Sequence, residues 1–214
     1  MSKNFLAQRD VAIVAYGETK IERASGKTAY ELAAAVAAEL FRKTGLEPKD
    51  IDGLMLGKSL SEAPNTFYSI FMADYLGITP RWSQVSDLGG ASACGNVARA
   101  ALALQAGLCE TVMLLAADAP STVNRSDYGC YRAEFWHPVG IQGPPGAFGL
   151  LMQRYMAQHE LDFRGLGALA VAQRKGAALN DNAYERFRKP ITVEDYLSSR
   201  VVSTPLRLLD SVMF

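Results

Sequence analysis

Apolar and polar positions alternate along the first half of the chain between strand-like and helix-like spacing. The short apolar runs that predict buried strands lie at residues 11–16, 51–57, 82–88 and 111–118. Apolar positions three and four residues apart predict helices over residues 28–44, 65–76 and 92–106. Strands that alternate with helices favour βαβ units and a largely parallel sheet.

Capping residues support these helix boundaries. Thr28 followed by Glu31 has the spacing of a capping box, in which each residue's side chain accepts from the other's backbone N–H. Gly45, Gly77 and Gly107 stand where the three helices are predicted to end, as glycine often does.

The alternation stops after residue 118. Residues 119–146 have no clear period and are rich in proline, glycine and aromatic residues, which is typical of a binding loop or lid. Helices are predicted over residues 148–159 and 166–179, and a short one begins at Thr192. Residues 201–209 are expected to return toward the core.

Composition narrows the function. Hydrophobic residues make up 49% of the 214 residues, enough for a sizeable core, which excludes a mainly disordered chain. The 22 basic and 22 acidic residues balance, which argues against a nucleic-acid binder. The apolar runs are too short to predict a membrane span, and we expect no such span and no secretion signal. The three cysteines have no CxxC spacing, so we expect a cytoplasmic protein without a structural metal.

The most informative stretch is the glycine-rich turn at residues 88–95 (LGGASACG), between a predicted strand and a predicted helix. Its glycines permit a sharp turn and the close approach of a ligand. The start of the following helix favours an anion and would activate a nucleophile. The alternative is purely structural, with Ser92 as the helix N-cap and Cys94 as a small packed thiol.

Several segments together resemble the thiolase superfamily. These are VAIVAYGETK, FRKTGLEPKDIDGLMLG, DLGGASACGNVARAALALQAGLCETVMLLAAD, RYMAQHELDFRGLGALAVAQRKGAALN and KPITVEDYLSSRVVSTPLRLLDS. The segments ITVEDYLSSR and TPLRLLD are similar to the sterol carrier protein x and lipid-transfer-type branch. The resemblance extends along nearly the whole chain.

The resemblance implies an α/β fold. We expect the first βαβαβαβ half of a thiolase-like fold, with a mixed sheet and an inserted helical loop domain. Residues 1–122 would form the α/β core and residues 123–200 the loop domain that faces substrate and coenzyme A. Residues 201–214 would form a truncated return segment to the core.

The implied activity is that of a lipid-metabolism enzyme acting on acyl-coenzyme A, without a covalently bound cofactor. An ungapped alignment on the end of the third helix places the family's nucleophile position on Gly90, and Cys94 lies about one turn further. Some members without that cysteine resemble retro-aldolases, which cleave a carbon–carbon bond in a coenzyme A thioester. The leading expectation is therefore a non-covalent mechanism in which Gly89, Gly90 and Ser92 hold the thioester oxygen or an enolate. The alternative is an acyltransferase, a covalent thiolase that uses Cys94.

Four further residues are candidates for substrate binding. His137 lies in the segment that corresponds to the family's substrate-facing insertion. An ordinary, partly exposed loop histidine is the simpler interpretation, because no partner carboxylate can be identified from the sequence. Arg174, Lys175 and Arg188 are candidates for the coenzyme A phosphates, or else form a solvated basic face balanced by nearby carboxylates. The residues interpreted as packing or helix-end residues are Cys109, Cys130 and His159.

The family's members are roughly twice this length. Their second half carries the His and Cys catalytic loops, so we expect this chain alone to be inactive. It would act as a homodimer, with a complementing C-terminal half, or with a small companion protein that contains an OB-fold. A third hypothesis is a non-catalytic half-fold that serves as a binding or assembly module.

Overall fold

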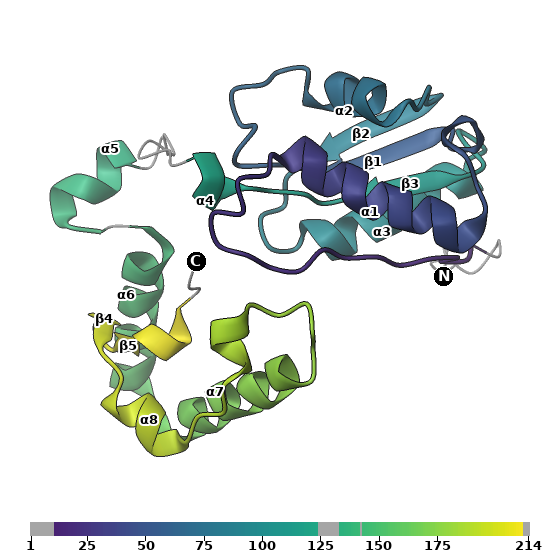
Figure 1. Cartoon of the computed structure of the whole chain (residues 1–214). Coiled ribbons are helices and arrows are strands. Elements are labelled where there is room, and N and C mark those ends of the chain that lie inside the picture. Colours follow the sequence, from purple (N-terminus) through teal and green to yellow (C-terminus); the bar gives the residue numbers. More distant parts are fainter. Residues whose placement is uncertain (1–10, 124–132, 142, 212–214) are drawn as a thin grey trace, which may run out of the picture. The chain divides into compact units, whose positions relative to one another are not determined.

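The computed structural model describes residues 11–123, 133–141 and 143–211. The chain divides into two compact units, the first formed by Met1–Thr19 with Ala24–Arg125 and the second by Lys20–Arg23 with Ser126–Phe214. The first unit holds a three-stranded sheet, and the second is mainly helical with a two-stranded hairpin (Figure 1).

The first unit follows the expected alternation of strands and helices. Its elements are α1 (Ala29–Thr44), η2 (Pro48–Asp50), β1 (Gly53–Gly57), α2 (Tyr68–Leu76), β2 (Trp82–Ser86), α3 (Ser92–Gln105), β3 (Val112–Leu115) and α4 (Pro120–Val123). The strand order is β2-β1-β3 and both pairings are parallel. Every residue of β1 is buried, because this central strand is covered on both faces.

Helices cover both faces of this sheet. On one face, Ala33 and Ala37 of α1 and Met72 of α2 form a buried cluster with Leu54 and Leu56 of β1. Successive strand residues point to opposite faces, so the intervening β1 residues face the other side. There α3 contacts all three strands. The sheet therefore has two helices on one face and α3 on the other.

The boundaries of α1 agree closely with those predicted from the sequence. Thr28 caps α1 in the expected box with Glu31, and Gly45 ends it in the left-handed conformation. Helix α2 begins at Tyr68, slightly later than predicted, because the Asn65 side chain accepts the N–H of Phe67 and forms a turn before it.

Two expectations about the sheet are wrong. Residues 11–16 are not a strand: they pair with no strand among the described residues, and Ile13 is 78% exposed. An apolar run becomes a strand only where a neighbour supplies its backbone hydrogen bonds. The described three-stranded sheet is also parallel rather than mixed. Antiparallel pairing among the described residues occurs in the second unit.

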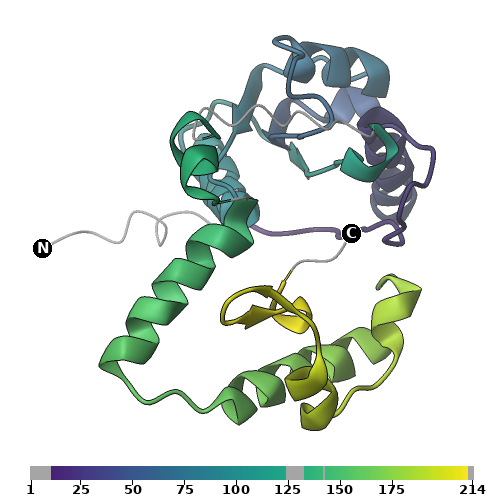
Figure 2. The ribbon, with the colours of Figure 1, turned by 90° about the vertical axis from the view of Figure 1, so that its left-hand side faces the viewer.

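The second unit places a hairpin against two helices. Its elements are α5 (Ala133–Trp136), η3 (His137–Val139), α6 (Gly143–Gln158), α7 (Phe163–Ala178), η4 (Glu185–Arg188), α8 (Val193–Ser198), β4 (Val201–Ser203), β5 (Leu206–Arg207) and η5 (Leu208–Asp210). The β4–β5 hairpin contacts α6, and η5 contacts α7 (Figure 2).

Close backbone approach fixes these contacts. A Cβ added at Gly149 of α6 would lie 2.7 Å from Ser203 Oγ and 3.1 Å from the Thr204 carbonyl oxygen. One turn along α6, Gln153 Nε2 donates to the same Thr204 oxygen at 2.8 Å. The helix and the hairpin therefore form one packed wall.

One segment of this region differs from expectation: residues 119–146 contain the short helices α4, α5 and η3, and α6 already begins at Gly143. Residues 201–211, the described part of the return segment expected over residues 201–214, belong to the second unit and pack on α6. The Gly149 contact with Ser203 provides a local reason, since only a glycine lets the hairpin approach so closely.

No helix in residues 11–123, 133–141 or 143–211 is long and apolar enough to cross a membrane.

Candidate functional site

Polar residues gather where the three parallel strands end. Lys58 and Ser59 follow β1, Asp87 follows β2, and Asp118 lies shortly after β3. Carboxyl ends of parallel strands share one edge of the sheet, which is the usual place for ligands in open α/β sheets. This edge, with the turn that leads into α3, is the candidate site of the first unit.

The turn into α3 is held by its own polar groups. Asp87 Oδ1 accepts the N–H of Gly89 at 3.1 Å, and Ser92 Oγ accepts the N–H of Leu88 at 2.9 Å. Gly89 has φ of 55°, a conformation that favours glycine. A Cβ added at Gly89 or at Gly90 would meet nothing within 4 Å. The glycines therefore leave the backbone open to a ligand.

A lysine that directly follows β1, the neighbour of β2 in the sheet, fixes the same turn. Lys58 Nζ lies 3.0 Å from Asp87 Oδ2. The hydrogen bond from Lys58 lowers the pKa of Asp87, and the N–H of Gly89 lowers it further. The carboxylate thus stays ionised and links the ends of β1 and β2 beside the glycine turn.

Ser92 and Cys94 occupy the first turn of α3. Ala91, not Ser92, is the N-cap, and it makes no side-chain cap, so the alternative interpretation of Ser92 as the N-cap is wrong. The Ser92 hydroxyl instead accepts a backbone N–H of the preceding turn, which holds the loop against the helix. Cys94 is an exposed free thiol. The structure thus brings together Gly89, Gly90, Ser92 and Cys94 at one helix start.

A buried pair beneath the turn was missed by sequence reasoning. Asn96, fully buried on α3, accepts a hydrogen bond from Ser86 Oγ at the end of β2. Its Nδ2 has no partner among the described residues. The sequence offered one signal for this pair: Asn96 is a polar residue one turn after Ser92, on the same face of the predicted helix.

A second network at this edge was also missed. Asp118 Oδ1 accepts from Ser59 Oγ at 3.1 Å and from the N–H of Ser61 at 2.9 Å, and Asp118 Oδ2 accepts the N–H of Leu60 at 3.0 Å. Ser59 and Ser61 are both buried. The carboxylate therefore joins the loop after β1 to the end of β3 and stiffens the edge.

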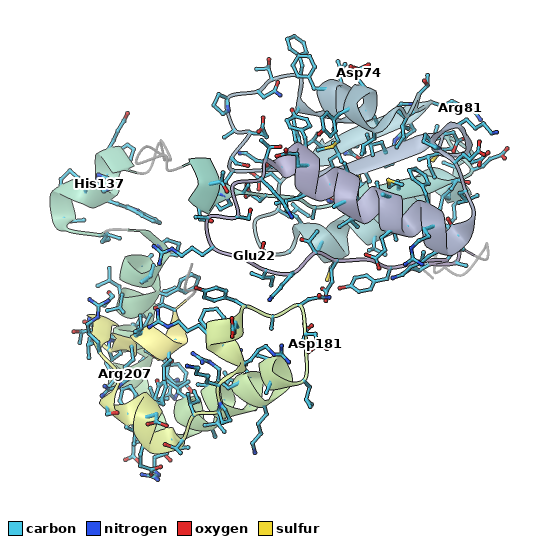
Figure 3. The ribbon with its side chains drawn as sticks, in the orientation of Figure 1. Glu22, Asp74, Arg81, His137, Asp181 and Arg207 are labelled. Carbon is cyan, nitrogen blue, oxygen red and sulfur yellow. The ribbon has the colours of Figure 1, made fainter. Side chains whose placement is uncertain are left out.

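The other predicted site residues lie in the second unit. His137 is exposed on η3, and Figure 3 shows it on a different segment from Arg207. Arg188 is paired with Asp181 at 2.7 Å. Lys175 is exposed and has no ion pair among the described residues. Of the three basic candidates, Arg188 is thus already engaged by a carboxylate.

Arg174 differs from these surface cations. Its guanidinium lies over the Phe187 ring, 5.0 Å from the centroid, and Nη1 donates to the Arg186 carbonyl oxygen at 3.3 Å. Burial lowers the pKa of Arg174, and the neighbouring Arg186 adds to the effect. Arg174 lines a cavity of about 350 Å³ together with Phe187, Asp210 and Ser211. Among the described residues no carboxylate forms a salt bridge with Arg174 or Lys175, so these two remain the anion-binding candidates.

The remaining described cysteine and histidine, Cys109 and His159, add no further candidate site. Cys109 is buried, as predicted, and burial raises the pKa of its thiol. Cys130 lies outside the described residues. His159 contacts the Tyr155 ring, with centroids 4.6 Å apart. The described part of the chain contains no group of three or more His, Cys, Asp or Glu residues that could hold a metal.

Comparison with curated proteins finds relatives of about twice this length. The chain is 33% identical over 211 residues to a 17-hydroxy-3-oxo-4-pregnene-20-carboxyl-CoA lyase of Mycobacterium tuberculosis, covering 93% of this chain and 53% of the relative. It is 32% identical over 212 residues to a steroid side-chain-cleaving aldolase of Thermomonospora curvata, covering 93% and 52%. An acetyl-CoA acetyltransferase of Methanocaldococcus jannaschii is 25% identical over 205 residues, covering 94% and 52%. No family model matches the chain.

Solved structures agree with this comparison. The Ltp2-ChsH2(DUF35) aldolase matches with a TM-score of 0.74 and 30% identity, over 88% of this chain and 48% of that one. A monomeric SCP2-thiolase like protein type 1 from Mycobacterium smegmatis shares the fold, with a TM-score of 0.60, 19% identity and coverage of 84% and 37%. The chain is therefore similar in sequence to these lyase, aldolase and acetyltransferase relatives and shares its fold with both solved structures, and it spans about half the length of the curated relatives it matches.

Proposed function

We propose that this chain supplies the coenzyme A thioester site of a thiolase-like enzyme that cleaves a carbon–carbon bond without a covalent intermediate. The observation that carries the proposal is the open turn at Gly89 and Gly90 before α3, with no side chain at the position where the resemblance puts the nucleophile. Two relatives above 30% identity are named as a lyase and an aldolase.

The reaction is a retro-aldol cleavage of a β-hydroxyacyl thioester. A base takes the proton of the hydroxyl group, its oxygen becomes a ketone, and the bond between the α and β carbons breaks. The electron pair of that bond forms the thioester enolate, which then takes a proton at the α carbon. The enolate oxygen binds at the turn, where the start of α3 provides positive partial charge.

This chain binds and orients the thioester, and other residues transfer the protons. Neither of its two histidines, His137 and His159, belongs to the first unit. We place the proton-transfer groups in a complementing C-terminal half, a second subunit or an OB-fold companion. The similar solved aldolase carries two protein names, Ltp2 and ChsH2, which supports a companion.

Arg174 and Lys175 bind the coenzyme A phosphates, and His137 contacts the arm that leads to the thioester. Arg188 contributes less, because Asp181 already neutralises it. Calorimetry with coenzyme A tests this assignment: Arg174→Ala weakens binding most and Arg188→Ala least. Equal affinity in all variants, or no binding at millimolar ligand, removes the assignment.

Intact-mass spectrometry separates the non-covalent mechanism from a thiolase that uses Cys94. After incubation with acetyl-coenzyme A, the natural chain should keep its mass, whereas Gly90→Cys should gain an acetyl group. Gly90 tolerates this side chain because a Cβ there meets nothing within 4 Å. An acetyl group on Cys94 of the natural chain would replace the lyase proposal by the acyltransferase alternative, which the exposure of Cys94 favours.

A further inference from the structure

The glycine turn before α3 is held by a negative charge, although the thioester proposed to bind there becomes an anion during the reaction. Asp87 Oδ1 accepts the N–H of Gly89 at 3.1 Å. Hydrogen bonds from Lys58 and from Gly89 lower the pKa of Asp87, so the carboxylate is ionised at neutral pH. An enolate at the turn would therefore lie near a like charge, which opposes its binding.

The hydrogen bonds of the turn indicate where the anion would lie. Four N–H groups already have acceptors within the turn, those of Leu88, Gly89, Ala91 and Ser92. A ligand at Gly90 displaces none of these bonds, and a Cβ there would meet nothing within 4 Å. Because consecutive Cα atoms are about 3.8 Å apart, an anion at Gly90 would lie within about 10 Å of the Asp87 carboxylate. Charges interact over this distance at moderate salt concentrations.

Lys58 provides the compensating charge. Its Nζ lies 3.0 Å from Asp87 Oδ2, whereas the other carboxylate oxygen binds the N–H of Gly89. Lys58 directly follows β1, and Asp87 directly follows β2. The last residues of these strands, Gly57 and Ser86, are paired in the parallel sheet. The register of the sheet thus places the ammonium group beside this carboxylate.

We propose that Lys58 is a positioning residue for the enolate: it neutralises Asp87, so that this carboxylate holds the glycine turn without repelling the anion bound there. The inference rests on the proposed function, because Lys58 has this role only if a thioester enolate binds at the turn. The side chains of Lys58 and Asp87 are 46% and 54% exposed, so the effect on anion binding is about two- to fivefold at low salt.

Two coenzyme A derivatives separate the charge from the rest of the ligand. Carboxymethyl-coenzyme A carries a stable negative charge one carbon from the sulfur, close to the place of the enolate oxygen. Acetonyl-coenzyme A has the same skeleton with a neutral methyl ketone. Calorimetry on the 214-residue chain at low salt gives the ratio of the two affinities, anion over ketone.

Lys58→Ala should lower this ratio by about two- to fivefold, because Asp87 keeps its charge and loses its cation. Lys58→Arg retains the positive charge and should give nearly the ratio of the natural chain. Salt at about 1 M should reduce the difference between the natural chain and Lys58→Ala, since it screens charges at exposed sites.

Asp87→Asn distinguishes this role from a purely structural one. The amide oxygen can still accept the N–H of Gly89, but the negative charge is gone, so the ratio should equal or exceed that of the natural chain. Combining Asp87→Asn with Lys58→Ala should recover the ratio that Lys58→Ala alone loses. Lys49→Ala is the matched control: Lys49 forms a 2.6 Å ion pair with Glu47 before the start of β1, and its loss should leave the ratio unchanged.

The outcomes separate this inference from the proposed function. An unchanged ratio in Lys58→Ala, or equal weakening of both derivatives, overturns the inference. A ratio lowered as much by Asp87→Asn as by Lys58→Ala also overturns it and assigns the pair to the folding of the turn. In these cases the natural chain still binds both derivatives, and the proposed function stands. If the natural chain binds neither derivative, the thioester site is wrong and the inference falls with it.

Discussion

The Tyr196 hydroxyl donates a 3.1 Å hydrogen bond to the carboxylate of Asp210. This bond connects α8 to the end of η5, and Asp210 also accepts the N–H of Arg207. Tyr196 is fully buried, and burial together with Asp210 raises its pKa to about 12. Tyr196 therefore holds the Asp210 carboxylate, which lines the cavity that contains Arg174.

Replacing Tyr196 by Phe should lower the free energy of unfolding by about 0.5–1.5 kcal/mol at neutral pH, because the hydrogen bond from the buried Tyr196 hydroxyl to Asp210 is lost. The natural chain should also lose stability as the pH rises from about 10 toward 12, since the unfolded tyrosine releases its proton at the lower pH. Urea unfolding across this pH range measures both effects. A parallel pH dependence in Tyr196→Phe would assign the alkaline loss to other groups.

The lowered pKa of Asp52 predicts that the free energy of unfolding falls at acid pH, the opposite of the alkaline loss expected from Tyr196. Partial burial favours its neutral form, but the backbone N–H groups of Thr111 and Glu110, with Arg81, outweigh burial and lower its pKa below 3.8. Its contribution to stability is thus complete above pH 3.8 and is lost as the pH falls through the lowered pKa.

Asp52→Asn should therefore cost about 1–2 kcal/mol at neutral pH and reduce the acid-dependent loss. Asp74→Asn on the exposed side of α2 is the control and should change neither. Thermal unfolding between neutral and acid pH gives the comparison. A control variant as unstable as Asp52→Asn would contradict the assigned role.

Gly149→Ala should destabilise the second unit by roughly 1–3 kcal/mol, because the new Cβ would lie 3.1 Å from the Thr204 carbonyl oxygen as well as near Ser203 Oγ. Gly176→Ala, within α7 with open space around it, should instead stabilise by about 0.5–1 kcal/mol through helix propensity. Denaturant midpoints of the two variants should move in opposite directions. Similar shifts would mean that helix propensity, not packing, decides both.

The two glycines of the candidate turn provide another matched pair. Gly89→Ala forces a side chain into a left-handed conformation and should cost about 1–2 kcal/mol, whereas Gly90→Ala should be nearly neutral for stability. Both should weaken thioester binding if the ligand contacts the turn. Unchanged thioester binding in Gly90→Ala would show that the ligand does not contact the turn.

Much of the first unit could be predicted from local sequence. The capping box at Thr28 and the left-handed glycine at Gly45 are decided by residues next to one another. The strand prediction for residues 11–16 was wrong because the same apolar sequence pattern occurs in paired strands and in unpaired segments. Whether such a segment pairs depends on residues that are distant in the sequence.

The site was predictable in part for the same reason. The turn at Gly89 is local, so its residues could be identified together. The Ser86–Asn96 pair depends on α3 packing across the end of β2, and the Asp118 network on two loops far apart in the sequence. Arg188 shows a limit of sequence reasoning about charges, because the sequence alone does not show that Asp181 is its ion-pair partner.

Asp210 and Ser211 line two cavities of the second unit. The smaller one contains Arg174, and the larger one, of about 940 Å³, is lined mainly by apolar side chains such as Phe148 and Leu151 of α6. A ligand in one that displaces these shared residues changes the affinity of the other. Thermodynamic linkage makes such an effect reciprocal, so the factor by which a ligand in the larger cavity alters anion binding equals the factor by which the anion alters binding in the larger cavity. An affinity measured for one cavity is therefore to be compared with the other cavity empty and filled.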